Sequence, residues 1–208
     1  MEIKISKREQ KRMETLNKLI DAMTSIIDKY DFDTLTIRNI CSVSGVSYGS
    51  FYNLFDSKEK FLTYYLTNDF VDFEKTYYTN NDEFTLLNSI EKSIDIFVTC
   101  ARYNVEKGLK FIRAFYSPKN FELSPFNQNE NFFCFTPLVK EAKEYLKKAQ
   151  EENILSRSVD IDIVIQEYCY LFNGCTFNWC IADGNLDIEN DVKKRLTNYI
   201  NSLEESQM

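Results

Sequence analysis

The segment Thr36–Leu62, TIRNICSVSGVSYGSFYNLFDSKEKFL, decides the fold of the N-terminal part of the chain. Thr36 is a residue type that favours helix N-caps, and the apolar residues after it follow helical spacing. Gly45 interrupts this pattern where a left-handed backbone would reverse the chain, and Ser47 can cap a second short helix. Two short helices joined by a glycine-containing turn form the helix-turn-helix plan.

The second short helix has two chemically different faces. On a helical wheel at about 100° per residue, Phe51, Leu54 and Phe55 share the face that would pack inward. The outward residues are Ser47 at the cap, Tyr48 at the leading tip, and Gly49, Ser50, Tyr52 and Asn53. A solvated face would more often carry Lys and Glu, whereas hydroxyl, phenol and amide groups suit DNA bases and phosphates. The glycine costs about 0.5–1 kcal/mol relative to Ala, which makes sense where the backbone approaches something bulky.

The charge of the chain is unevenly distributed. Its 208 residues carry a net charge of -7, and read globally this argues against a nucleic-acid partner. However, residues 1–60 hold ten Lys and Arg against nine Asp and Glu, whereas residues 61–208 hold fifteen against twenty-three. A basic cluster lies at the start of the first predicted helix and consists of Lys4, Lys7, Arg8, Lys11 and Arg12. Such a cluster is typical either of a solvated helix start or of a surface that attracts DNA independently of its sequence.

The composition narrows the function classes. The chain has no His, which excludes Ser-His-Asp and Cys-His catalysis and His-ligated zinc. The six cysteines form no CxxC pair, so we expect reduced, buried side chains. We therefore expect no enzyme, no metal and no cofactor. No apolar stretch approaches the length of a membrane span and no export signal is recognisable, so we expect a cytoplasmic protein without a membrane segment.

The whole chain is predicted to be all-α, with a three-helix helix-turn-helix head over 1–56 and a larger helical ligand-binding and dimerisation domain over 57–208. The first helix, over 8–29, should bury a stripe beginning Met13, Leu16, Ile20 and Met23. Ser57 should cap a helix over 58–79, and the three prolines favour a loop over 117–135. A helix starting near residue 161 is apolar on nearly every side, which predicts burial all round.

The last two predicted helices are candidates for half of a four-helix bundle shared with a second subunit. The alternative is simple core burial within one subunit. The dimer-interface candidates are Ile165, Phe172, Trp179, Val192, Leu196, Tyr199 and Leu203.

The N-terminal sequence resembles the tetracycline-repressor-like (TetR/AcrR) family of bacterial transcription regulators. The matching residues are Thr36, Ile40, Gly45-Val46-Ser47, Gly49, Phe51-Tyr52, Phe55, Ser57-Lys58-Glu59 and Leu62. The resemblance implies a homodimeric repressor that binds a palindromic double-stranded DNA operator and is released by a small molecule, with the helix over 58–79 as the hinge. In such a protein Thr36 would contact a phosphate. Tyr48 and Ser50 would lie nearest the base edges, and Tyr52 and Lys58 would contact the DNA backbone. Arg38 and Asn53 would also face outward.

The effector is expected to be lipophilic or aromatic, because aromatic residues make up 15% of the chain. Candidate pocket residues, each of which could equally be core, are Phe97, Cys100, Phe111, Phe115, Tyr168, Phe172 and Trp179. Two other functions remain open. The chain could be a helical small-molecule-binding protein with a vestigial DNA head, or a DNA-binding protein without an effector.

Overall fold

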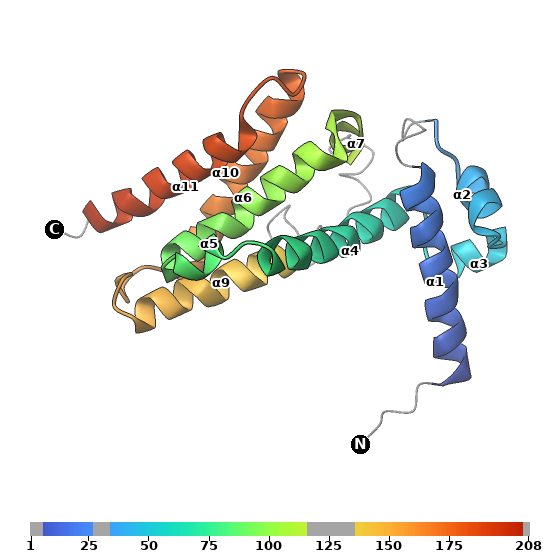
Figure 1. Cartoon of the computed structure of the whole chain (residues 1–208), viewed down its shortest axis with the longest axis horizontal. Coiled ribbons are helices and arrows are strands. Elements are labelled where there is room, and N and C mark those ends of the chain that lie inside the picture. Colours follow the sequence, from blue (N-terminus) through green and yellow to red (C-terminus); the bar gives the residue numbers. More distant parts are fainter. Residues whose placement is uncertain (1–5, 27–33, 116–135, 206–208) are drawn as a thin grey trace. The chain divides into compact units, whose positions relative to one another are not determined.

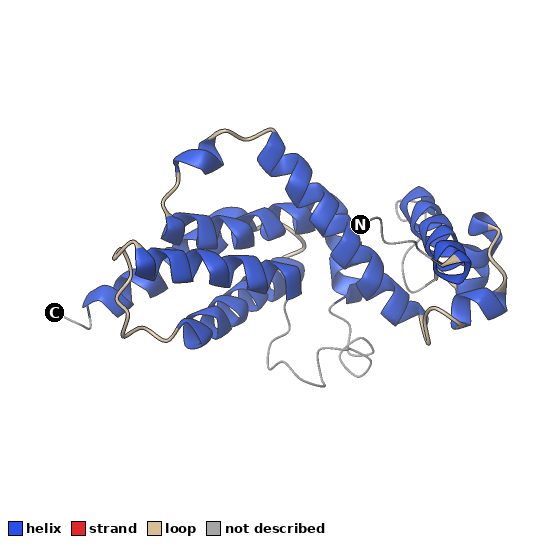
Figure 2. Cartoon of the chain, turned by 90° about the horizontal axis from the view of Figure 1, so that it is seen from below, coloured by secondary structure: helices blue, strands red, loops and turns tan. Residues whose placement is uncertain are grey.

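The computed structural model describes residues 6–26, 34–115 and 136–205. These residues form ten helices and no strand (Figures 1 and 2). None of the described helices is both long enough and apolar enough to cross a membrane. The predicted loop over 117–135 and Cys134 lie outside the described residues. The described chain separates into two compact units, with one division inside a long helix after Leu66 and a second after Ile112. The predicted domain boundary between residues 56 and 57 stays a prediction.

The first unit contains three helices, α1 (Lys7–Ile26), α2 (Ile37–Ser44) and α3 (Tyr48–Tyr52), and the first half of α4 (Lys58–Thr79). Helix α2 packs against both α1 and α3. The core contains an aromatic cluster in which the rings of Phe51, Phe55 and Phe61 lie 5.0–5.8 Å apart. Helix α1 contributes Leu19, Ala22, Met23 and Ile26 to this core.

The predicted stripe on α1 was wrong except at Met23. Met13 is 48% exposed, and Leu16 and Ile20 are only half-buried. The buried face instead includes Leu19 and Ala22, so the helix is rotated relative to the prediction. Fully buried residues are confined to the C-terminal half of α1. The apolar residues nearer its N-terminus therefore do not indicate which face of the helix packs against the core.

The second unit is built around α6 (Ser89–Lys107), which packs against α9 (Thr136–Glu151) and α11 (Ile188–Glu205). Helix α10 (Ile161–Ile181) packs against α9, α11 and α6. The short helices α5 (Glu83–Leu86) and α7 (Leu109–Phe115) complete the described part of the chain (Figure 1). Helix α6 buries twelve of its nineteen residues, which makes it the central element of this unit.

Helix starts follow local capping chemistry. Ser57 Oγ accepts a hydrogen bond of 3.1 Å from the backbone N–H of Lys60, and α4 begins at Lys58 as predicted. Asn88 forms a capping box with Glu91 at the start of α6, so two otherwise unpaired backbone donors are satisfied there. The cysteines at positions 41, 100, 169, 175 and 180 are buried and free, as expected.

Candidate functional site

The turn between α2 and α3 has the geometry that its sequence predicts. Thr36 caps α2 and forms a capping box with Asn39: the Asn39 N–H donates to Thr36 Oγ1 over 3.2 Å, and the Thr36 N–H donates to Asn39 Oδ1 over 3.0 Å. Gly45 ends the helix with φ 67°, in the left-handed region that favours glycine. The Val46 N–H donates to Ser44 Oγ over 3.2 Å, and the Val46 side chain is buried. The turn therefore fixes where α3 starts.

Helix α3 presents a polar and aromatic surface to solvent. Ser47 caps it by accepting a 3.2 Å hydrogen bond from the Ser50 N–H, and the two serine hydroxyls lie 2.8 Å apart. Tyr48 is 43% exposed and Tyr52 is 50% exposed, with ring centroids 6.3 Å apart. Gly49, which follows Tyr48 in the sequence, is also exposed, and a Cβ added there would meet no atom within 4 Å. The surface is thus chemically suited to reading DNA and has no steric cause within the protein for its glycine.

The remaining predicted DNA-binding residues lie around α3. Arg38, on the first turn of α2, and Asn53, at the end of α3, are both exposed. Lys58 has a structural contact that the sequence did not predict: its ammonium Nζ donates to the carbonyl oxygen of Leu35 over 2.9 Å. This bond ties the start of α4 to the segment before α2. Any phosphate contact by Lys58 must therefore share an ammonium that already has a partner.

The basic cluster lies on the first turns of α1, except for Lys4, which is outside the described residues. Lys7, Arg8, Lys11 and Arg12 are all exposed. Arg12 forms an ion pair of 3.4 Å with Glu9, a pair that contributes little because both side chains are in water. The cluster therefore remains available to a polyanion.

The effector-pocket candidates lie mainly in the core of the second unit. Phe97 makes edge-on ring contacts with Tyr168 at 5.5 Å and with Phe172 at 5.7 Å, so the structure brings these three together. Cys100, Phe111 and Trp179 are also buried, and the side chain of Phe115 lies outside the described part. Among the candidates whose side chains are described, none lines a cavity of about 830 Å³ in the second unit. Their assignment to an effector pocket stays a prediction.

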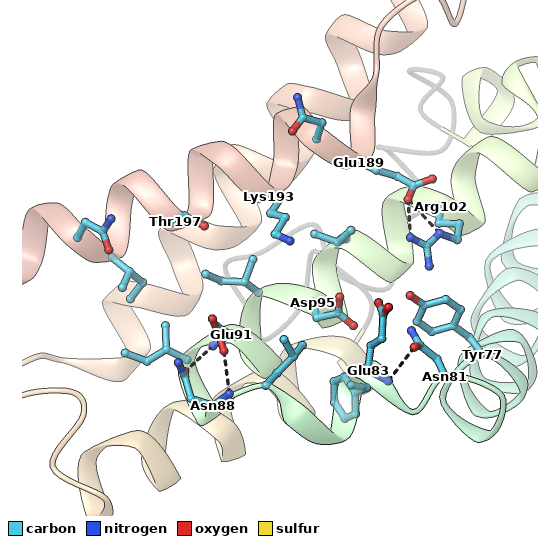
Figure 3. A pocket seen from close by; sticks show the side chains of 18 of the residues that line it. Tyr77, Asn81, Glu83, Asn88, Glu91, Asp95, Arg102, Glu189, Lys193 and Thr197 are labelled. Atoms are coloured by element: carbon cyan, nitrogen blue, oxygen red, sulfur yellow. Dashed lines mark hydrogen bonds and ion pairs between the residues drawn. The ribbon is translucent and has the colours of Figure 1, made fainter.

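That cavity has a volume of about 830 Å³ and lies between α6 and α11, with residues of α5 and the end of α4 around it (Figure 3). Its apolar lining includes Ile90, Ile94 and Val98 from α6. Charged side chains also line it, among them Asp95 and Arg102 from α6. Sequence reasoning missed this site because charged residues were not considered as candidates for a lipophilic pocket.

The dimer-interface candidates point into the chain's own core. Ile165, Phe172, Trp179, Val192 and Leu196 are each at most 4% exposed, and Tyr199 and Leu203 are half-buried.

The predicted burial of α10 on every side was wrong, because a second stripe is exposed. It consists of Ile163, Tyr170, Phe177 and Ile181, which are 51–63% exposed and spaced by seven, seven and four residues. We call these four residues the α10 stripe. The spacing of these residues can be seen in the sequence. Because the helix has two apolar faces, however, the sequence does not indicate which face the rest of the chain covers.

A capped helix-turn-helix with a polar, exposed second helix, carried by an otherwise helical chain, defines a DNA-binding transcription regulator. Residues 19–65 match the family model described as bacterial regulatory proteins, tetR family. This match confirms the predicted resemblance to the TetR/AcrR family over these N-terminal residues. None of the curated proteins matches the chain.

Several solved structures share the fold. FadR of Thermus thermophilus, a TetR-family repressor solved in complex with lauroyl-CoA, is 17% identical, with a TM-score of 0.65 over 88% of this chain and 91% of its own. FadR of Bacillus halodurans, a regulator of fatty acid degradation, is 15% identical, with a TM-score of 0.57 over 89% and 94%. A TetR regulator from Haloarcula marismortui is 15% identical, with a TM-score of 0.51 over 91% and 98%. At these identities the likeness shows the fold alone.

Proposed function

We propose that this protein is a homodimeric repressor that binds a palindromic operator through α3 and leaves it when a small lipophilic molecule binds the second unit. The observation that carries the proposal is the exposed surface of α3, which presents Tyr48, Tyr52 and a glycine at which an added Cβ would meet no atom within 4 Å. Chromosomal DNA as the target implies a protein of the bacterial cytoplasm.

In this proposal the helix-turn-helix enters the major groove with Tyr48 and Ser50 nearest the base edges. The N-terminus of α2, capped by Thr36, faces a phosphate, since the first turn of a helix attracts anions. Tyr52 and Lys58 hold the DNA backbone. Arg38, Asn53 and the hydroxyl of Ser47 complete the surface, and the basic cluster on α1 adds attraction that salt weakens.

The homodimer is supported by the α10 stripe. Large apolar side chains that are more than half exposed, repeated along one face of a helix, are typical of a protein-protein contact. Gly174 lies on the same face between Tyr170 and Phe177, is exposed, and would place an added Cβ in open space with no atom within 4 Å. A small residue at this point lets a second helix approach closely. The proposed dimer interface is therefore the α10 stripe, and not the buried candidates such as Ile165 and Phe172.

The release step is supported by the cavity between α6 and α11. Its volume of about 830 Å³ falls in the range of roughly 300–1,000 Å³ typical of small-molecule sites. The lauroyl-CoA bound to the Thermus protein provides one lipophilic compound to test. A molecule that binds one arrangement of the two heads better than another shifts the population and lowers DNA affinity, with α4 as the connecting helix.

The test is fluorescence anisotropy with a duplex from just upstream of the gene and with a scrambled duplex, each at two salt concentrations. Selective binding that weakens with salt supports the proposal. If the upstream duplex fails, selection from random duplexes distinguishes a distant operator from a binding protein with a vestigial head, which would select no sequence. Specific binding that no ligand panel changes would favour a regulator without an effector.

The dimer is tested by Phe177→Asp, which places a charge in the middle of the α10 stripe. We expect a monomer in sedimentation velocity and at least about 10-fold weaker operator binding, because a buried unpaired charge costs several kcal/mol. Asn178→Asp makes the same charge change at the next exposed residue of α10 and is the matched control. A Phe177→Asp protein that remains dimeric would contradict this interface.

A further inference from the structure

The cavity between α6 and α11 is lined by both apolar and charged side chains, all from residues of the second unit (Figure 3). Ile90, Ile94 and Val98 repeat every four residues along α6 and form one side. Ile200 of α11 and Phe84 of α5 add to the apolar lining. This part of the cavity suits an alkyl or aromatic body but does not select its polar head.

The lining carries more negative than positive charge. Five carboxylates line the cavity, Glu83, Glu91, Asp95, Asp187 and Glu189, against the two cations Arg102 and Lys193. An anionic ligand would therefore enter an acidic environment, whereas a cationic ligand would be attracted to it.

Most of these charged side chains already have partners within the protein. Arg102 donates from Nε and Nη2 to Glu189 Oε2 over 2.9 and 2.7 Å, and its guanidinium lies 4.5 Å from the centre of the Tyr77 ring. Glu91 accepts from the Asn88 N–H over 2.8 Å. Arg102 is thus neutralised by a carboxylate and is a poor anchor for an anion.

Asp95 differs from these residues. Its carboxyl group lines the cavity, and its Oδ2 atom is shielded from solvent without a hydrogen-bond partner among the described residues. Burial raises the pKa of Asp95, although Arg102, Lys193 and the hydroxyl groups of Tyr78 and Thr99 act in the opposite direction. A half-buried carboxyl group with one oxygen that lacks a hydrogen-bond partner is a site where a ligand cation gains more than it would in water.

We propose that this cavity binds a small amphipathic amine, whose ammonium group pairs with Asp95 and whose apolar body lies on Ile90, Ile94 and Val98. The inference rests on the proposed function in one respect, that the bound amine acts as the effector. Lys193 lies across the cavity on an exposed side chain of α11. It competes with the ligand for Asp95 and can turn to solvent as the amine enters, as long lysine side chains do.

The experiment is isothermal titration calorimetry of the full chain with octylamine and with octanoate, which share the alkyl body and differ in the charge of the head. We expect octylamine to bind more tightly than octanoate. Asp95→Asn should weaken octylamine binding at least about 10-fold, because it removes a charge-assisted hydrogen bond while keeping the side chain's shape. Glu151→Gln makes the same change at an exposed position outside the cavity and should leave binding unaltered.

Lys193→Gln tests the same site with the opposite sign and does not depend on how well Asp95→Asn folds. Because it removes the competing cation, it should tighten octylamine binding about threefold or more. Tighter binding of octanoate, no binding of octylamine, or equal octylamine affinity in wild type and both cavity variants overturns the inference.

Operator binding in the presence of each compound separates this inference from the proposed function. Asp95-dependent octylamine binding that leaves DNA affinity unchanged supports the amine site and counts against an effector role. An operator complex that forms normally while octylamine fails to bind overturns the amine site and leaves the repressor proposal standing.

Discussion

Gly49→Ala is expected to stabilise the free protein and weaken its complex with DNA. Gly49 is the second residue of α3, its φ is outside the positive region, and an added methyl meets no atom within 4 Å. Alanine should therefore stabilise the folded protein by up to about 0.5–1 kcal/mol, the usual difference from glycine in a helix. Nothing within the described protein opposes this gain.

The same methyl group has a cost if α3 lies against DNA. Inserting a methyl into a packed contact typically costs about 1–3 kcal/mol. A dimer carries two copies, so even the lower figure gives about 2 kcal/mol, or about 30-fold in affinity. Stability and DNA affinity should consequently change in opposite directions, which a general disturbance of the fold cannot produce.

Urea unfolding measures the first change and fluorescence anisotropy on a selected operator measures the second. Asn17→Ala, on the exposed side of α1, is the control, since it also raises helix propensity, by up to about 0.7 kcal/mol, away from the proposed DNA surface. Wild-type operator affinity in Gly49→Ala would refute the close approach of α3 to DNA. A loss of stability in that variant would refute the interpretation of the glycine as locally unstrained.

Three further predictions concern charged groups. Lys58→Met should lower the free energy of unfolding by about 1–3 kcal/mol in urea denaturation, because it leaves a backbone carbonyl without its donor; an unchanged midpoint at constant m-value would show that this bond contributes nothing. Replacing Lys7 and Lys11 with Gln should reduce the slope of log K against log salt by about 0.9 for each phosphate contact removed, and an unaltered slope would exclude the cluster from the DNA surface. Burial, followed by Glu141, raises the pKa of Glu74 from 4.5 to about 7, so the folded state keeps a proton that the unfolded state has released. Stability should therefore be greatest below pH 4.5 with respect to this group and fall by up to about 3 kcal/mol as the pH rises through 7. Glu74→Gln should abolish this part of the pH dependence in urea titrations from pH 5 to 8, and an identical profile in the variant would contradict it.

The parts of the fold that follow from short-range chemistry could be predicted from the sequence. Thr36, Gly45, Ser47 and Ser57 act within four residues of their own positions, through a side-chain hydrogen bond or a left-handed backbone. The turn of the helix-turn-helix and the start of α4 are therefore encoded locally, and both occur as predicted. The outward surface of α3 follows in turn, since Phe51 must point into the core.

Features that depend on distant segments could not be predicted in this way. Helix α10 has two apolar faces, and only the packing of α6, α9 and α11 shows that Ile165 is covered while Phe177 is not. The cavity likewise combines residues from α4 to α11, such as Asp95 and Lys193, that are about a hundred positions apart. Aromatic content pointed to Phe97 and Tyr168 as pocket residues, whereas large rings fill the core because they bury the most apolar area.

The distribution of charge differs between the first sixty residues and the rest of the chain. Acidic residues exceed basic ones by eight over residues 61–208 and fall one short of them over residues 1–60. Negative charge over residues 61–208 disfavours contact of that part of the chain with phosphates, which favours the head and its basic cluster as the proposed DNA-binding part. Part of the same excess lies in the cavity, where five carboxylates face two cations and Asp95 lacks a partner for one oxygen. An acidic composition that argues against a nucleic-acid partner on a global count is therefore compatible with one when charge is counted along the chain, because the acidic excess lies outside residues 1–60.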